Sequence, residues 1–267
     1  MSTNRSASSG DAASAPPEVV EIARAARRVV VLTGAGMSAE SGIPTFRDAQ
    51  TGLWEHHNPE ELATPEAWER DPDFVWAWYR WRAKLIRDVE PNAGHRALAA
   101  WSDADRAEVW IVTQNVDDLH ERAGSSVLAH LHGSIFALRC SQCDTPFEEN
   151  DAPELALPAT PVDRLAPPRC PVCGGAVRPG IVWFGEELPH DAFAHAEAVI
   201  DSADLVLSVG TSGNVFPAAA LPYGALRKGT PVVEINPAET EFSTDATIVW
   251  RSTAAAALPA LVGSLGR

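Results

Sequence analysis

The chain has 267 residues, of which 45% are hydrophobic and 21% charged, and its formal net charge is -15. This length suits one large domain or two modest ones, and the composition is typical of a globular protein with an ample core. Nucleic-acid binding is disfavoured, because neutralising phosphates requires clustered lysines and arginines that the sequence lacks. The acidic field also repels anionic substrates, so any anion that binds requires a local cation.

The first sixteen residues, MSTNRSASSGDAASAP, are polar and small. They lack the apolar centre of a secretory signal, and Asp11 argues against a transit peptide, which is rich in arginine and poor in acid. We therefore expect a disordered tail over residues 1–16. No apolar run approaches the roughly 20 residues that span a bilayer. We expect a cytoplasmic protein without a membrane partner.

The first predicted elements are a helix and a buried strand. Residues 17–28 carry one apolar stripe, with acids early and arginines late, as the helix dipole favours. The segment RVVVLT, residues 28–33, is then typical of a buried strand that runs into Gly34-Ala35-Gly36. After a polar, proline-containing stretch, the tryptophan-rich segment 76–86 and residues 95–101 are predicted to be helical.

The tryptophan-rich segment WAWYRWRAKLI, residues 76–86, allows two interpretations. In the first, it is a half-buried helix with its aromatic rings inward and its cations in solvent. In the second, Tyr79 and Arg82 act together, because residues three apart share one helix face and can reach one target. Arg80 is expected to face solvent in both.

Short apolar strands followed by helices make up most of the remaining chain. Predicted strands cover residues 109–115, 204–212, 231–236 and 248–250, and predicted helices cover 116–124, 217–229 and 254–265. This alternation predicts an α/β fold with a Rossmann-like, doubly wound parallel sheet that binds its ligand at the carboxyl ends of the strands. Between Cys140 and Cys173 the chain is proline-rich without helical periodicity, which indicates a small inserted module over residues 137–180.

Two C-x-x-C pairs, at Cys140 and Cys143 and at Cys170 and Cys173, contain the four cysteines of the chain. Four thiolates in two such pairs suit one tetrahedral zinc ion, and a closed shell of sulfur ligands makes the zinc structural. Disulfides are the alternative, which the lack of a secretion signal disfavours.

The glycine turn Gly34-Ala35-Gly36 follows the first strand, where backbone amides can approach a pyrophosphate and a helix N-terminus adds positive potential. A tight structural turn is the alternative explanation. The spacing departs from the dehydrogenase fingerprint, because Ala39 stands where a third glycine is expected and no acid ends a second strand about twenty residues on. Hydride transfer is correspondingly disfavoured.

Several runs along the chain form a pattern: GAGMSAESGIPTFRD (34–48), TQNVDDLHERAG (113–124), LHGS (131–134), IVWFGE (181–186), GTSGNVFPAA (210–219) and EINP (234–237), in addition to the cysteine pairs. Together they resemble the sirtuin family of NAD-dependent protein-lysine deacylases. The similarity covers residues 17–267. It implies a Rossmann-like catalytic domain over 17–267, with an inserted zinc-binding module over 137–180 and a helical insertion over 50–95 that carries the acyl pocket.

The resemblance also implies roles for individual residues. His132 would be the catalytic base that deprotonates a ribose hydroxyl after the acyl-lysine carbonyl oxygen has attacked the nicotinamide ribose and nicotinamide has left. Asn115 and Asp117 would act with it, and the products would be free lysine, nicotinamide and O-acyl-ADP-ribose. The implied NAD-binding residues are Gly34, Ala35, Gly36, Ser38, Ala39, Ile43, Phe46, Arg47, Gln114, Asn115, Asp117, Gly210, Thr211, Ser212, Asn236, Pro237, Ala238 and Ala254.

The substrate would be an acyl-lysine protein that adds as an extended strand along Val182, Trp183, Phe184 and Gly185. Sirtuins that prefer succinyl- and malonyl-lysine carry a Tyr-x-x-Arg pair, which Tyr79 and Arg82 match, and a small residue, which Ala63 matches. A guanidinium can hold a carboxylate bidentately while the phenol donates a further bond. Screening limits the repulsion of outer charges to ~8 Å at physiological salt.

Alternative functions remain open from the sequence. The chain could be a general deacetylase in which Tyr79 and Arg82 only pack, a mono-ADP-ribosyltransferase, or a zinc scaffold that needs neither His132 nor Asn115. Asn214 and Phe216 depart from the family pattern near the peptide channel, which puts the preference for residues around the lysine in doubt. We expect a monomer.

Overall fold

The computed structural model describes residues 14–44, 59–104, 106–148 and 157–266. Its larger lobe is built on a six-stranded sheet with the order β3-β2-β1-β7-β8-β9. The strands are β1 (Arg28–Thr33), β2 (Glu108–Thr113), β3 (Val127–His130), β7 (Leu205–Val209), β8 (Val232–Ile235) and β9 (Ile248–Trp250), and every neighbouring pair is parallel. The order reverses between β1 and β7, which is the topological switch point at which doubly wound sheets bind ligands.

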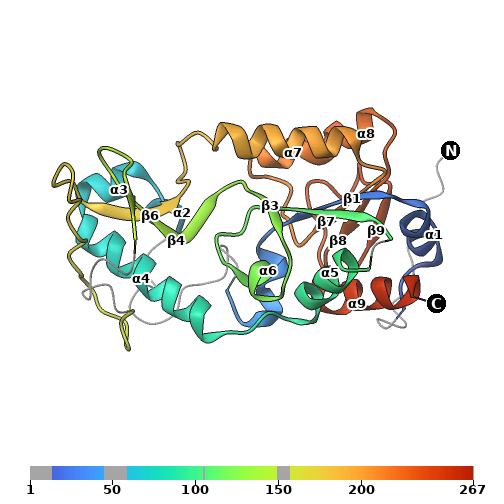
Figure 1. Ribbon diagram of the computed structural model, residues 1–267, viewed down its shortest axis with the longest axis horizontal. Coiled ribbons are helices and arrows are strands. Elements are labelled where there is room, and N and C mark those ends of the chain that lie inside the picture. The colour runs from blue at the N-terminus through green and yellow to red at the C-terminus, as the bar shows by residue number, and fades with distance from the viewer. Residues whose placement is uncertain (1–13, 45–58, 105, 149–156, 267) are drawn as a thin grey trace.

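Helices cover both faces of this sheet, which explains why its central strands consist mostly of consecutive apolar residues. Side chains alternate along β1, so that Val29 and Val31 join one core cluster while Val30 and Leu32 join another. The first cluster includes residues of α1 (Pro17–Ala25), α5 (Ala93–Ser102) and α9 (Ala254–Leu265). The second includes residues of α7 (His190–Ser202) and α8 (Leu221–Arg227). Figure 1 shows α7 and α8 on the opposite side of the sheet from α5 and α9.

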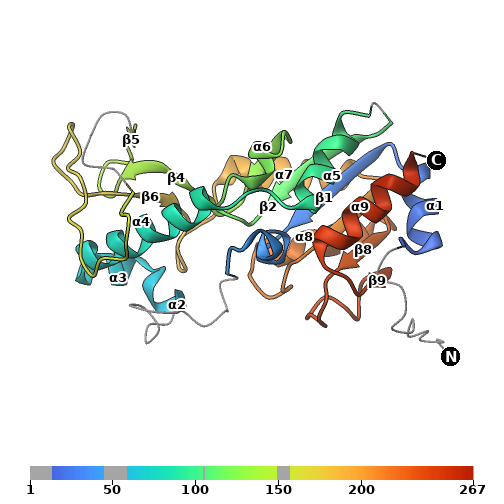
Figure 2. The ribbon, with the colours of Figure 1, turned by 90° about the horizontal axis from the view of Figure 1, so that it is seen from below.

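The smaller lobe combines helices with a second sheet. The antiparallel sheet has the order β5-β4-β6, formed by β4 (Gly133–Cys140), β5 (Pro146–Phe147) and β6 (Val177–Ile181). Beside it lie α2 (Pro59–Leu62), α3 (Pro65–Arg70) and the long α4 (Pro72–Asp88), and one apolar cluster joins these helices to β4 and β6. In Figures 1 and 2 this lobe occupies the end of the molecule remote from α1 and α9.

Short elements follow the carboxyl ends of β1, β2 and β7. They are the 3-10 turns η1 (Ala35–Met37), η2 (Ala39–Ser41) and η6 (Ala218–Ala220) and the short helix α6 (Leu119–Arg122). The sequence suggested a helix after the glycine turn, but η1 and η2 are short, so the described residues place no extended helix dipole there. The prediction for the tail falls mostly on residues 1–13, which lie outside the described part of the chain.

The prediction that Arg80 faces solvent is wrong. Its side chain was expected to face solvent, but only 2% of the residue is exposed, and its guanidinium carbon lies 5.3 Å from the centre of the Trp76 ring. Residues 75–80 of α4 are all buried, so this helix is covered on more than one side. Leu157 and Leu165 pack against its apolar cluster, and the Leu165 amide donates to the carbonyl of Asp73 at 3.1 Å.

Membrane spanning finds no support among the helices. Within the described residues, none is both long and apolar enough to cross a bilayer.

Candidate active site

The glycine turn after β1 packs directly on the end of β7. A Cβ atom on Gly36 would lie 2.7 Å from the Gly210 Cα, and one on Gly34 would lie 2.8 Å from the Gly210 carbonyl oxygen. The Gly36 amide donates to that same oxygen at 2.9 Å. Gly210 itself has a φ of +62°, which side chains rarely adopt. The glycines are thus needed for this contact at the switch point whether or not a phosphate lies above them.

A buried polar chain joins the loops that follow β1 and β2, next to the switch point. The Asn115 side-chain amide donates to Ser38 Oγ at 3.1 Å, and the Ser38 hydroxyl donates to Asp117 Oδ2 at 2.9 Å. Burial raises the pKa of Asp117, although hydrogen bonds from the Leu119 amide and the Ser38 hydroxyl partly oppose this. The structure therefore brings Ser38, Asn115 and Asp117 together beside the ends of β1 and β2.

His132 lies between β3 and β4, and its ring is held by a backbone contact. Its Nδ1 lies 3.0 Å from the carbonyl oxygen of Gln114. Because a carbonyl oxygen only accepts, Nδ1 carries the proton and Nε2 carries the lone pair of the neutral ring. Burial lowers the pKa of His132, and the contact with Gln114 opposes the shift without cancelling it. A partly buried imidazole with a fixed tautomer is a suitable general base.

The carboxyl ends of β7 and β8 hold a second group of predicted residues. The Asn236 side-chain amide donates to the Thr211 carbonyl at 2.9 Å, and the Asn236 Oδ1 accepts from the Ala238 amide at 3.2 Å. Glu234, which is 1% exposed, accepts from Arg251 at 3.0 Å, and Arg251 also donates to the Ala238 carbonyl at 2.8 Å. These bonds fix the loop after β8 against the loop after β7.

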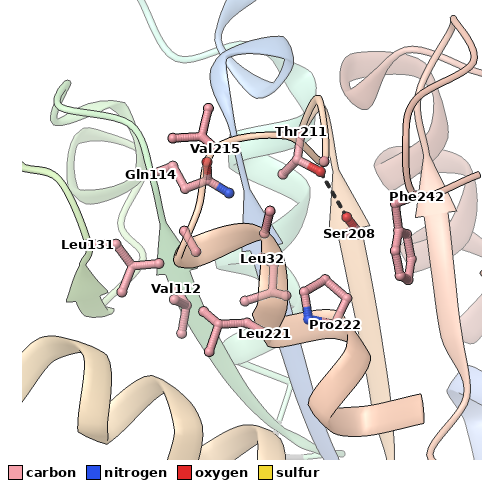
Figure 3. Close-up of a pocket in the computed structure, with 13 residues that line it drawn as sticks. Leu32, Val112, Gln114, Leu131, Ser208, Thr211, Val215, Leu221, Pro222 and Phe242 are labelled. Carbon is pink, nitrogen blue, oxygen red and sulfur yellow. Dashed lines mark hydrogen bonds between the residues drawn. The ribbon is translucent and has the colours of Figure 1, made fainter. Parts of the chain in front are cut away.

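A small cavity lies at the ends of β1, β2 and β7, as Figure 3 shows. Its volume is about 10 Å³, and Leu32, Gln114 and Thr211 are among the residues that line it. Such a volume holds about one water molecule, so a dinucleotide cannot enter it. The Thr211 hydroxyl lies 3.0 Å from that of Ser208.

The four cysteines converge in the smaller lobe. Their sulfur atoms all lie within 4.8 Å of one another, and the pairs Cys140–Cys173 and Cys143–Cys170 are 3.4 and 3.7 Å apart. Zinc–sulfur bonds of about 2.3 Å place tetrahedral sulfurs about 3.8 Å apart, whereas a disulfide requires about 2.05 Å. The donor set therefore fits one structural zinc ion. All four cysteines are free thiols, which excludes the disulfide alternative.

Tyr79 and Arg82 lie at a junction between α4 and the segment after β6. The Tyr79 ring is buried, and its hydroxyl accepts a hydrogen bond of 2.9 Å from the Trp183 indole. The Arg82 guanidinium carbon lies 5.1 Å from the centre of the Trp78 ring, which also contacts Tyr79. Burial raises the pKa of Tyr79 and lowers that of Arg82, and their mutual interaction opposes both shifts. Ala63 is buried in the same cluster.

Residues 182–185 form the predicted peptide-binding edge, and three of its backbone amides already donate hydrogen bonds within the chain. Val182 donates to the His132 carbonyl, Phe184 donates to the Ala63 carbonyl, each at 2.9 Å, and Trp183 donates to Glu186 at 2.8 Å. A peptide strand added here would therefore donate to carbonyl oxygens of the segment instead of accepting from these amides. The bonds also tie the edge to His132 on one side and to the Ala63 region on the other.

The remaining predicted residues are placed less centrally. Phe46 and Arg47 lie outside the described residues. Ile43 packs partly buried against the smaller lobe's cluster, and Ala254, the first residue of α9, is buried in a core cluster of the larger lobe. Ala35, Ser212 and Gly185 are partly exposed or exposed, as are Ala39 and Pro237.

Sequence reasoning missed a buried hydrogen-bonded group beneath Asn115. The Thr113 Oγ1 accepts from the Asn115 amide at 3.0 Å and from the Thr33 hydroxyl at 2.8 Å, and the Thr33 oxygen lies 3.1 Å from His120 Nε2. The His95 ring packs edge-on against that of His120, with centres 4.8 Å apart. The only available signal was polar residues ending two predicted strands, which also suits ordinary turns.

Comparison with known proteins decides the family. The Sir2 family model matches residues 34–217 of the chain. The chain belongs to the Sir2 family. Among curated relatives of this Sir2 protein, the NAD-dependent protein deacylase of Corynebacterium glutamicum is 55% identical over 92% of the chain and 94% of that protein. The NAD-dependent protein deacylase of Mycobacterium tuberculosis is 53% identical over 89% and 98%.

Solved Sir2 structures share the fold. A Sir2 homologue in complex with NAD superposes with a TM-score of 0.85 at 40% identity, covering 95% of this chain and 96% of that one. Sir2 with a deacetylated p53 peptide and 3′-O-acetyl ADP-ribose superposes at 0.76 with 31% identity, covering 92% and 98%. The described residues of this Sir2 protein therefore adopt the family's fold, with its Rossmann-like parallel sheet and a four-cysteine module.

Proposed function

We propose that the protein is an NAD-dependent protein-lysine deacylase that prefers succinyl and malonyl groups to acetyl groups. The names of its relatives support the deacylase activity, and NAD is bound in a related solved structure. The observation that carries the proposal is the fixed His132 tautomer beside the buried chain of Asn115, Ser38 and Asp117.

These residues fit a bound NAD. When bound, NAD supplies the electrophilic ribose carbon and receives the acyl group. Asn115 and Asp117 offer an amide and a carboxylate to the ribose and carboxamide, and Ser38 holds both in position. Asn236 and Thr211 lie at the neighbouring strand ends, where the adenosine half would bind. With Nδ1 bonded to Gln114, Nε2 of His132 is the atom that takes a proton from a ribose hydroxyl.

The acyl preference rests on Tyr79 and Arg82. Within α4 the two side chains interact electrostatically, and Tyr79 belongs to a cluster that also contains Ala63 and Trp183. A carboxylate at the far end of a succinyl chain would receive a charge-assisted bond from Arg82 and a bond from Tyr79, whereas an acetyl group offers no acceptor there. Shielding by the surrounding tryptophans strengthens both bonds.

The sharpest test replaces Arg82 with methionine, which keeps an unbranched apolar stem. We expect Arg82→Met to lower kcat/KM for a succinyl peptide by about 10- to 100-fold, since a hydrogen bond to a charged group contributes about 1.5–3 kcal/mol. The acetyl peptide should lose much less. The matched control is Lys84→Met, which removes a cation of the same helix that pairs with Asp88. If the wild type and Arg82→Met each turn over the succinyl and acetyl peptides equally, the preference is contradicted and general deacetylation is left as the function.

The remaining assignments follow the same proposal. Residues 17–267 would form the catalytic domain, with the zinc-binding module over 137–180 and the acyl-pocket insertion over 50–95. The structure's second sheet begins at Gly133 and ends at Ile181, and α5 extends from Ala93 to Ser102, so elements cross three of these boundaries. A cytoplasmic location and a monomeric state stay predictions.

A further inference from the structure

Trp183 contacts the acyl-pocket cluster through its one polar atom. Its Nε1 donates to the Tyr79 hydroxyl at 2.9 Å, and the rings of Tyr79 and Trp183 are stacked with centres 6.2 Å apart. Trp183 is 2% exposed and Tyr79 is 3% exposed, so water does not compete for this bond. The contact joins α4 to the segment after β6, 104 residues away.

The direction of this hydrogen bond is fixed by chemistry. An indole N–H can only donate, so the Tyr79 oxygen must accept. The hydroxyl proton must then point away from Trp183, and a buried hydroxyl proton requires an acceptor to avoid a desolvation penalty. Burial raises the pKa of Tyr79, so the phenol keeps this proton at every physiological pH.

The indole also contacts a cation. The Arg178 guanidinium carbon lies 3.2 Å from the centre of the Trp183 ring, and Arg178 donates to both carboxylate oxygens of Glu186, at 2.6 and 2.9 Å. Glu186 also accepts from the Trp183 amide at 2.8 Å. A cation on the ring face and a fixed backbone leave the indole little freedom to turn away from Tyr79.

We propose that Trp183 is a positioning residue for acyl selection, whose indole N–H turns the Tyr79 hydroxyl proton toward the acyl chain. The pocket then presents a donor from Tyr79 beside the cation of Arg82, and it favours acyl groups whose far end accepts a hydrogen bond. This inference rests on the proposed acyl preference. It assigns to Trp183 a side-chain role that is separate from the backbone role of the peptide edge.

The test is a double-mutant cycle of Trp183→Phe and Tyr79→Phe, measured with acetyl and succinyl forms of one peptide. Trp183→Phe keeps an aromatic ring and removes the N–H. We expect it to raise KM for the succinyl peptide about 2- to 10-fold, as loss of one oriented hydrogen bond predicts, with a smaller change in kcat. The succinyl-to-acetyl ratio of kcat/KM should fall by the same factor. In the Tyr79→Phe background, Trp183→Phe should leave that ratio unchanged.

The matched control is Trp68→Phe, because Trp68 packs against Trp183 with ring centres 5.6 Å apart and belongs to the same buried cluster. It should leave the succinyl-to-acetyl ratio unchanged. Thermal unfolding of the variants separates loss of packing from loss of orientation. Additive effects of the two mutations on the ratio, or an equal fall with Trp68→Phe, would overturn the inference while leaving the Arg82 result intact. A wild-type enzyme without succinyl preference would overturn both.

Discussion

At the residue scale, the His132 imidazole shows how one backbone contact determines chemistry. The Gln114 carbonyl selects the tautomer, and burial lowers the pKa of the ring from its usual 6.5. The tautomer leaves the lone pair of the neutral ring on Nε2, and burial keeps the ring neutral and able to accept a proton at neutral pH.

The lowered pKa of His132 predicts how kcat/KM falls as the solution becomes acidic. A base with a lowered pKa stays neutral until the pH falls below 6.5, so kcat/KM should fall with an apparent pKa below that value. The profile is measured with acyl peptide at subsaturating concentration and saturating NAD. His132→Asn should abolish the acid limb together with at least 100-fold of the activity, because general base catalysis contributes roughly 10²–10⁴-fold. An acid limb centred above pH 7 would contradict the assignment.

The sequence could predict the identity of these residues more easily than their surroundings. The motifs placed Asn115, Asp117 and His132 near one ligand, and the structure brings Asn115 and Asp117 together through Ser38. Arg80 was mispredicted because helical spacing shows which residues share a face and does not show how many faces are covered. The Trp183–Tyr79 bond joins residues too far apart in the chain for any local pattern to indicate it.

At the element scale, the glycine turn depends on backbone contact. Gly36→Ala would place a Cβ 2.7 Å from the Gly210 Cα, and neither backbone can yield easily. We expect a loss of about 1–3 kcal/mol in the free energy of unfolding, measured by urea denaturation, together with weaker NAD binding. Gly263→Ala is the control, since its Cβ would meet nothing within 4 Å in α9, and it should stabilise the chain by up to about 1 kcal/mol. Similar effects of both substitutions would contradict the contact.

Strands β4 and β6 connect the zinc module to the site around His132. β4 begins directly after His132, and β6 leads into the segment whose Val182 amide donates to the His132 carbonyl. We predict one zinc ion per chain by elemental analysis. Removing it with a chelator, or substituting Cys143→Ser, should lower both the melting temperature and the activity, because the metal's binding energy contributes to folding. Full activity and unchanged melting after complete zinc removal would contradict a structural role.

Elements with strong signals could be predicted from the sequence, and weak ones could not. The strands that became β1, β2, β7, β8 and β9 are continuous apolar runs, and the fold class followed from them. Strand β3 and helix α7 were not predicted. Strand β3 is short, and helix α7 is rich in alanine with few large apolar residues. Neither therefore shows a distinctive hydrophobic period.

At the scale of the whole molecule, buried histidines make stability depend on pH. Burial lowers the pKa of His95 to about 4 and that of His120 to about 3, from 6.5 in each case. The unfolded chain binds protons near pH 6.5 while the folded chain does not, so stability falls as the pH drops from 6.5 toward these values.

We therefore predict that acid destabilises the wild type more than a His95→Gln variant. Each pKa unit corresponds to about 1.4 kcal/mol, so His95 should account for about 3 kcal/mol of the loss between pH 6.5 and 4. Urea denaturation at several pH values measures the difference. The exposed His190 supplies the control, because His190→Gln should follow the wild type throughout. Parallel curves for the wild type and His95→Gln would contradict the prediction.

We propose that this Sir2 protein removes acyl groups from lysine with consumption of NAD, and most efficiently when the acyl group ends in a carboxylate. Mass spectrometry of one peptide carrying acetyl, propionyl, malonyl, succinyl or glutaryl lysine, each with and without NAD, tests it most directly. We expect free lysine peptide, nicotinamide and O-acyl-ADP-ribose in equal amounts only with NAD, with the fastest release from succinyl and malonyl lysine. ADP-ribose attached to the peptide, deacylation without NAD, or acetyl turnover equal to that of succinyl would contradict it.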